Sequence, residues 1–221
     1  AAAGGDVQVT GAVLDGRVKA GGSVHVDQAI LGTCCEVQAD GDITCQHAMS
    51  ALLRAGGRIE ISDEATWCRL QAEHIDIDGG RGLAFGGELR ARQTIHLRVA
   101  GTPNGAATRL SVCDLDEEHA ELATREADDA KVTRTAVRPT GSHQQARQRL
   151  LLRQRDMLRT ATIRIADTVH PGVVIQFGQV AMSISETLHD VTFHYDPEQN
   201  AIVRGPLPAH VPVTPRDGPG K

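Results

Sequence analysis

Thiol and imidazole side chains are the first candidates for chemistry in this sequence. The cysteines and the ten histidines are scattered, and the nearest pairing is Cys45 with His47. In a stack of repeats this pair could meet Cys34 or Cys35 of a neighbouring repeat and form a metal site. We interpret Cys45 instead as a small buried thiol beside a surface histidine, and we expect reduced cysteines, as in a cytoplasmic protein. The cysteines are Cys34, Cys35, Cys45, Cys68 and Cys113.

Carboxylates are the second candidate group, because clustered acids carry out catalysis in many carbohydrate-active enzymes. Asp76 and Asp78 lie two residues apart, so they would project from one face of a strand. Asp42 and Glu60 are expected at matching outward positions, two and three repeats earlier. Stacked outward charges are typical of a solvated face, and aromatic residues make up only 2 % of the chain, which leaves no platform for a sugar. We therefore predict no catalytic, cofactor-binding or metal-binding residue and no enzyme.

A repeat of about 17 residues, counted along the printed sequence, places these side chains. Each unit has two short runs in which apolar and polar residues alternate, and the second run ends in alanine. The glycine or alanine at each corner recurs at the same position of the repeat. The alternating runs begin at Gly5, Gly22, Gly41, Gly57, His74 and Gln93, and the alanines are Ala3, Ala20, Ala39, Ala55, Ala72 and Ala91. One unit cannot bury its inward face alone, but stacked units can. We predict a mainly β fold with a right-handed parallel β-helix over residues 1–113. A β-sandwich would have no reason to keep this phase.

The repeat stops after Cys113, where a charged sequence without glycine or proline runs to about Thr135. This segment is acidic, and the segment from Gln144 to about Arg159 is basic. We predict that they form an antiparallel α-helical hairpin, packed as a short coiled coil and inserted at residues 114–160. Two separately docked helices are the alternative. The expected seam consists of Leu115, Leu122, Val132, Leu150, Leu151, Met157 and Leu158.

Strand-like sequence returns at residues 161–204, and we expect it to extend the β-helix or to cap its end, which would otherwise expose backbone and apolar groups. Residues 205–221 are rich in glycine and proline, so we expect a disordered tail. The chain begins in the middle of a repeat, so we expect it to be a fragment of a longer protein.

Composition excludes several functional classes. The formal net charge of −5 argues against a strongly nucleic-acid-binding surface, which normally needs a basic patch. The sequence has no run of 18 apolar residues, so we expect no membrane span. It also has no serine-hydrolase, zinc-protease or phosphate-loop motif.

Three features together resemble the flagellar assembly protein A family. They are the Gly-Asp/Ser/Arg-Val/Ile units, the Gly-Thr-Pro-Asn-Gly loop at 101–105, and the segment 161–178, which reads A-T-I-R-I and then V-H-P-G-V-V-I-Q-F-G. The resemblance implies a right-handed β-helix with an inserted helical hairpin. It also implies a non-enzymatic cytoplasmic role in polar flagellum assembly or motility.

The partners implied by this resemblance are proteins of the flagellum or the cell pole, and some family members are linked to a sugar phosphotransferase protein. A homo-oligomer is also among the expected assemblies. Two other non-enzymatic functions stay open. One is a division-site regulator like the C-terminal domain of MinC, and the other is a bactofilin-like filament former. A carbohydrate-active enzyme using Asp76 or Asp78 is the competing enzymatic interpretation.

Overall fold

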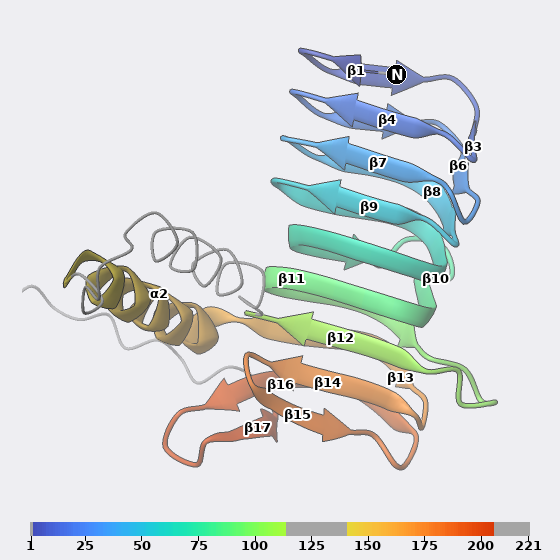
Figure 1. Ribbon diagram of the computed structural model, residues 1–221. Coiled ribbons are helices and arrows are strands. Elements are labelled where there is room, and N and C mark those ends of the chain that lie inside the picture. Colours follow the sequence, from blue (N-terminus) through green and yellow to red (C-terminus); the bar gives the residue numbers. More distant parts are fainter. Residues whose placement is uncertain (1, 114–140, 206–221) are drawn as a thin grey trace, which may run out of the picture.

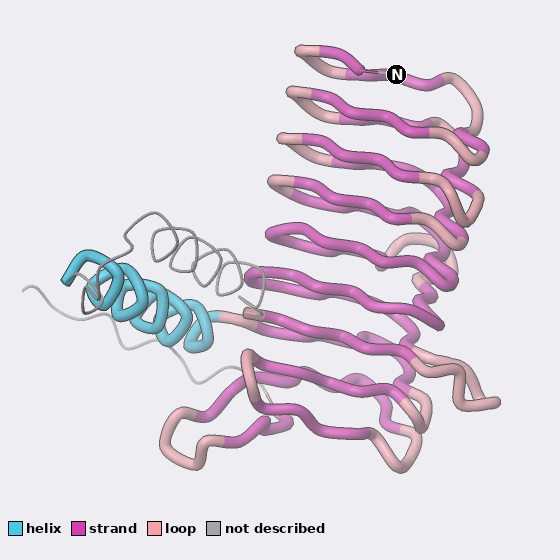
Figure 2. The backbone as a smooth tube through the Cα atoms, viewed as in Figure 1, coloured by secondary structure: helices cyan, strands magenta, loops and turns pink. Residues whose placement is uncertain are grey.

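The computed structural model describes residues 2–113 and 141–205 and is dominated by a β-solenoid of about six turns. Figure 1 shows the turns stacked along one axis, with helix α2 leaving the stack at its side. Short connections link the strands at the corners of each turn (Figure 2). The elements are β1 (Ala2–Ala3), β2 (Val7–Val9), β3 (Val13–Leu14), β4 (Arg17–Ala20), β5 (Val24–Val26), β6 (Ala29–Leu31), β7 (Glu36–Ala39), β8 (Ile43–Met49), β9 (Leu52–Ala55), β10 (Arg58–Ile77), β11 (Leu83–Ala100), β12 (Thr108–Val112), α2 (Gly141–Thr160), β13 (Thr162–Val169), β14 (Val173–Phe177), β15 (Val180–Ser183), β16 (Leu188–Asp196) and β17 (Ala201–Arg204).

Each turn of the solenoid has three faces, not the two that the sequence predicts. The first face begins with β2 and β5, the second with β3 and β6, and the third with β4 and β7. The second face was missed because its strands are two or three residues long, too short to show an alternating pattern. In later turns the faces merge into long bent strands, so β10 alone passes through all three.

The parallel register confirms the phase that the glycine and alanine positions predict. Val7 lies beside Val24, Val24 beside Ile43 and Ile43 beside Ile59, while Ala3 lies beside Ala20. From the second turn onward these columns place aliphatic side chains above one another in a core of almost fully buried residues, whereas in the first turn Val7 is partly buried and Ala3 is exposed. Right-handed winding stays a prediction.

At two of the repeated glycines, Gly22 and Gly57, an aspartate side chain of the preceding turn approaches the glycine backbone closely. A Cβ added to Gly22 would lie 2.1 Å from Asp6 Oδ1, and one added to Gly57 would lie 2.3 Å from Asp42 Oδ1. The aspartates themselves join the turns, since Asp42 Oδ1 accepts a hydrogen bond of 2.7 Å from the backbone N–H of Arg58. The Gly-Asp pairs of the repeat are therefore a structural feature of the corner.

Residues 114–160 interrupt the solenoid at one corner without changing its register. Across this corner Ala91 lies beside Val112, and Thr94 lies beside Thr162. In the preceding turn the two-residue segment Arg92–Gln93 makes this corner, and here Cys113 and Ala161 occupy the same two positions. The insertion leaves from between Cys113 and Ala161, both fully buried. The solenoid therefore resumes where it stopped.

The second arm of the predicted hairpin is confirmed as a helix, α2, which begins at Gly141 and ends at Thr160. The predicted first arm, residues 114 to about 135, lies outside the described residues, as does the tail from 206. Among the described residues, no helix is both long and apolar enough to cross a membrane.

The C-terminal strands both extend and cap the solenoid. β13 and β14 add a further turn by parallel pairing with β11 and β12. β15, β16 and β17 then pair in antiparallel fashion with β14, β13 and β16. Antiparallel strands cannot continue a parallel winding, so they end it, and Phe177 of β14 and Phe193 of β16 are fully buried in the core there.

Candidate interaction surface

Four of the five cysteines are part of the core. Cys35, Cys45, Cys68 and Cys113 are buried, Cys34 is exposed, and all five are free thiols. Burial raises the pKa of Cys45 to about 12, of Cys68 to about 11 and of Cys113 to about 12. A thiol with such a pKa stays protonated at neutral pH and is a poor nucleophile and metal ligand.

The interpretation of Cys45 as a buried thiol beside a surface histidine agrees with the structure, because Cys45 is buried and His47 is partly exposed. His47 Nδ1 lies 3.4 Å from Asp63 Oδ2 and 4.0 Å from Glu64 Oε1. Arg81 joins both carboxylates, at 3.0 Å and 2.8 Å. Its hydrogen bonds lower the pKa of Asp63. No group of three or more metal-ligating side chains occurs within the described ranges.

The candidate carboxylates do not form a catalytic pair. Asp76 forms ion pairs with Arg58 at 3.2 Å and with His96 at 3.1 Å, while Asp78 is exposed directly after the end of β10. Glu60 belongs to the outward row of Asp76, but only one turn earlier. Asp42 lies beside Arg58 in the neighbouring outward row. The prediction that Asp42 and Glu60 occupy matching outward positions two and three turns before Asp76 was therefore wrong.

Polar pairs cover the outer side of the first and third faces. On the first face, His25 pairs with Asp27 at 3.2 Å. On the third face, Glu88 pairs with Arg90 at 3.0 Å, and Arg109 donates a hydrogen bond of 2.8 Å to Gln176. The sequence predicts outward charges of this kind, and where such a pair is exposed, as for His25 and Asp27, it contributes little to stability.

The second face differs because its outward side chains are largely apolar. One outward row joins consecutive turns through Leu14, Leu31 and Met49 and continues two turns later at Phe85. Trp67 stands beside Phe85, with ring centroids 6.4 Å apart in an edge-to-face arrangement. Leu14, Met49 and Trp67 are 67, 47 and 58 % exposed. We call Leu14, Leu31, Met49, Trp67 and Phe85 the apolar ridge. Contiguous exposed apolar side chains commonly mark an interaction site.

The backbone of Trp67 supports this interpretation. Its φ is +55°, in the left-handed region that bulky side chains rarely adopt, and Gly32 and Gly86 hold the same corner in other turns. Asp15 and Ser50, with φ of +42° and +54°, complete the column. The fold needs a left-handed residue here but not an indole. Strain of this kind is concentrated at functional sites.

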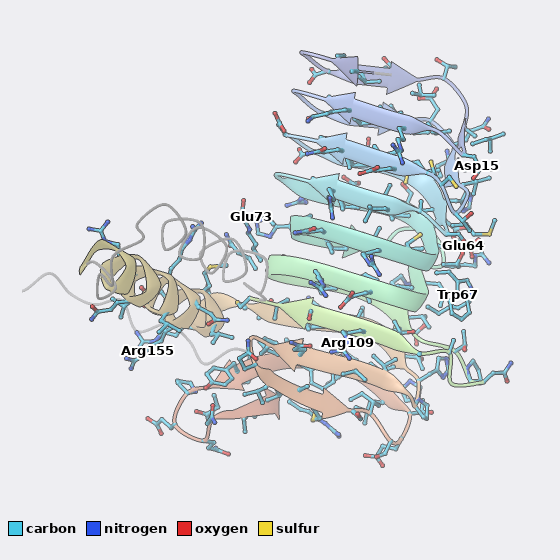
Figure 3. The ribbon with its side chains drawn as sticks, viewed as in Figure 1. Asp15, Glu64, Trp67, Glu73, Arg109 and Arg155 are labelled. Atoms are coloured by element: carbon cyan, nitrogen blue, oxygen red, sulfur yellow. The ribbon has the colours of Figure 1, made fainter. Side chains whose placement is uncertain are left out.

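Sequence reasoning missed the apolar ridge altogether. The signal was present as dipeptides 17 or 18 residues apart, each with an inward residue followed by an outward apolar one. They are Val13–Leu14, Ile30–Leu31 and Ala48–Met49. Figure 3 places Asp15, Glu64 and Trp67 along this edge of the stack, on the side away from α2.

Helix α2 is a second candidate surface. One of its sides docks on the solenoid: Gln154 Nε2 donates a hydrogen bond of 3.0 Å to the carbonyl of Cys113, and Met157 and Leu158 pack against the core. Leu151 and Leu152 are 52 and 53 % exposed. The exposed arginines on the described part of the helix are Arg149, Arg153, Arg155 and Arg159.

Together, these features define a parallel β-solenoid with a side arm and an apolar outer face. A family model described as the Flagellar Assembly Protein A beta solenoid domain matches residues 2–137, more than half of the 221 residues. The chain therefore belongs to this family, which suggests a role in flagellar assembly. Comparisons with curated proteins and with solved structures give no match.

Proposed function

We propose that this chain is a non-enzymatic scaffold for assembly of a polar flagellum, acting in the cytoplasm through protein–protein contacts. The observation that carries the proposal is the insertion corner between Cys113 and Ala161. A rigid stack of turns holds a helical arm there and continues in unchanged register on the other side. This arrangement suits the presentation of a contact element at a fixed position on a rod.

The family match supports flagellar assembly over the division-regulator and filament interpretations. The proposed partners are components of the flagellum or the cell pole, and a sugar phosphotransferase protein is a further candidate. We also propose that the acidic segment 114–135 pairs with the basic α2 as an antiparallel hairpin. The functional units would then be residues 1–113, 114–160 and 161–204, with a tail from 205.

The arm can be removed at a site that the structure defines. Deleting residues 114–160 joins Cys113 to Ala161, which restores the two-residue corner found at Arg92–Gln93 in the preceding turn. We expect the shortened protein to keep its β-sheet circular dichroism and cooperative unfolding. Cells that carry it in place of the natural gene should lose flagellar motility, and partner capture should fail.

A matched control replaces residues 114–160 with a Gly-Ser linker of equal length, which keeps the spacing but removes the arm's side chains. We expect this control to behave like the deletion. Full motility in a strain with the folded deletion protein would refute the role of the arm.

A further inference from the structure

We propose that the third face of the solenoid, together with the apolar ridge along one of its edges, binds the surface of an anionic lipid membrane. The proposal goes beyond the scaffold function and does not depend on it, because it uses no residue of the insertion 114–160. It rests on the charge of one face and on the apolar side chains that border it.

The third face carries an excess of positive charge, although the formal net charge of the whole chain is −5. Its outward positions from β4 to β12 hold more cations than acids. The cations are Arg17, Lys19, Arg54, Arg69, Arg90 and Arg109, and the acids are Glu36 and Glu88. The excess belongs to this face alone among the two polar ones. On the first face the outward acids are Asp6, Asp42, Glu60 and Asp76, and the outward arginines are Arg58 and Arg164.

The cations of the third face also reach farther into solvent than the acids. The side chain of Glu88 is 21 % exposed, against 69 % for Arg69 and 48 % for Arg109. Glu88 lies 3.0 Å from Arg90 and 4.0 Å from each of the other two arginines, so one carboxylate is shared by three guanidinium groups. An anionic surface that approaches this face therefore meets positive charge first.

The apolar ridge borders the third face directly. The chain passes from Thr66 on the second face through Trp67 to Arg69 on the third, so the indole stands at the shared corner. The other four ridge residues each precede the left-handed corner residue of their own turn. They are Leu14, Leu31, Met49 and Phe85. Apolar side chains thus line the edge of a basic face over consecutive turns.

Three acids lie on the second-face side of this edge, and they leave the cations in excess. Asp15 is one of the corner residues, while Asp63 and Glu64 are both joined by Arg81. With so modest an excess, charge alone gives weak binding. Stable attachment to a membrane commonly combines a basic patch with an apolar anchor, and the ridge supplies the anchor here.

The surface is flat and is left open by the arm. Figure 1 shows β4, β7, β9, β12 and β14 side by side as one sheet, with α2 beyond one edge. Figure 3 places Trp67 at the opposite edge from Arg155 of α2. From β4 to β12 the face spans about 24 Å at the usual strand spacing. A lipid surface can follow a flat face over this whole length without a complementary shape.

A membrane fits these features better than a protein or a nucleic acid does. The centre of a protein interface is usually depleted of charged residues, whereas Arg69, Glu88 and Arg90 occupy the middle of this face. A nucleic acid presents phosphates and base edges, so it offers no counterpart for the aliphatic side chains of the ridge. Tryptophan at the headgroup level, beside basic residues that attract anionic lipids, is typical of interfacial binding.

The experiment is co-sedimentation of the full chain with vesicles of phosphatidylcholine alone and of phosphatidylcholine mixed equally with phosphatidylglycerol, at low and high salt. We expect binding to the mixed vesicles, at least about tenfold weaker binding to the neutral ones, and loss of binding as salt screens the charges. Trp67 is the one tryptophan of the chain, so its fluorescence reports on the ridge directly. Its emission should shift to shorter wavelength on the mixed vesicles.

Charge reversal at matched positions tests the face. Arg54 is exposed between Gln38 and Gln71 on the third face, and Arg164 is exposed between His96 and Thr192 on the first. Arg54→Glu should weaken binding to the mixed vesicles roughly 30-fold, at about fivefold for each unit of charge. Arg164→Glu changes the net charge equally and should have little effect.

A ridge variant tests the anchor. Trp67→Asn keeps a residue that tolerates the left-handed backbone and should weaken binding roughly tenfold. Circular dichroism shows whether each variant is folded, and Lys19→Glu replaces Arg54→Glu if the latter does not fold. The proposal is overturned if the natural chain does not bind the mixed vesicles at low salt, or if binding leaves the emission of Trp67 unchanged. Equal losses for Arg54→Glu and Arg164→Glu, or binding to DNA or polyglutamate without binding to vesicles, also overturn it.

Discussion

At the residue scale, left-handed backbone conformation recurs at the corners, and the room around it differs from site to site. Gly87 has a φ of +90°, and a Cβ there would lie 2.2 Å from the carbonyl oxygen of Cys68. Gly105 has a φ of +72°, but a Cβ would meet nothing within 4 Å. The two glycines share one backbone requirement, and Gly87 has a steric requirement as well.

This difference predicts unequal effects of alanine substitution. Gly105→Ala should cost about 1 kcal/mol, the strain of a left-handed L-residue. Gly87→Ala adds a clash with backbone that cannot move aside, so we expect a loss of roughly 3 kcal/mol. Urea unfolding followed by circular dichroism measures both. Equal losses for the two variants would show that the corner at Gly87 relaxes freely.

The sequence predicts the inward residues well and the outward ridge poorly, for a physical reason. Inward positions such as Ile43 and Ile59 recur because burial selects aliphatic side chains turn after turn. An outward position has no such constraint. Leu14 or Met49 taken alone resembles an ordinary exposed residue, and only their stacking in space reveals the ridge.

At the element scale, α2 is attached to the solenoid through a small contact around Gln154. This side chain is 8 % exposed, and its amide is bonded to the carbonyl of Cys113 at the insertion corner. Gly178 leaves room beside it, because a Cβ there would lie 3.3 Å from Gln154 Nε2. The helix therefore has one polar anchor with apolar contacts from Met157 and Leu158.

Gln154→Ala should loosen α2 while the solenoid stays intact. The substitution leaves the buried carbonyl of Cys113 without this donor, at a cost of about 1 kcal/mol. Amide hydrogen exchange should then become faster in residues 148–160 and stay unchanged in β5 to β12. Arg155→Ala, an exposed neighbour, serves as the control. Equal exchange in α2 of the natural chain and Gln154→Ala would show that apolar contacts alone hold the helix.

Elements with a local signal could be predicted, whereas elements fixed by distant contacts could not. The basic stretch that becomes α2 was found within three residues of its true start, because helix formation is largely local. The antiparallel pairing of β16 with β13 joins residues that lie 19 positions apart in the chain at Val169 and Leu188 and 32 apart at Thr162 and His194. No local pattern distinguishes this pairing from one more parallel turn.

At the scale of the whole molecule, the two ends of the solenoid differ. At the N-terminal end the described edge strands are short, with two to four residues each in β1 to β4. At the other end, β16 covers β13, a strand of eight residues. A long uncovered strand edge is a template for aggregation, and a short one is much less so.

Truncation at the two ends should therefore have different outcomes. Removal of residues 1–20 exposes β5 to β7, which are as short as the strands they replace, so the protein should stay soluble with lower stability. Removal of residues 186–221 uncovers the edge of β13, whose Ile163 and Ile165 are fully buried, so we expect aggregation. Light scattering during expression and purification measures both. Aggregation of the first truncation and not the second would contradict this account.

The insertion corner has a consequence for how such a molecule can change over time. Register is complete at Val112 and begins again at Thr162, and the core on either side does not depend on the length of what lies between. The corner is therefore an insertion site where a segment of another length or sequence can replace residues 114–160 while every turn of the solenoid keeps its neighbours. Under the proposed scaffold function, a change confined to residues 114–160 would alter the contact element while the solenoid keeps its fold, and a foreign peptide could be grafted at the same place.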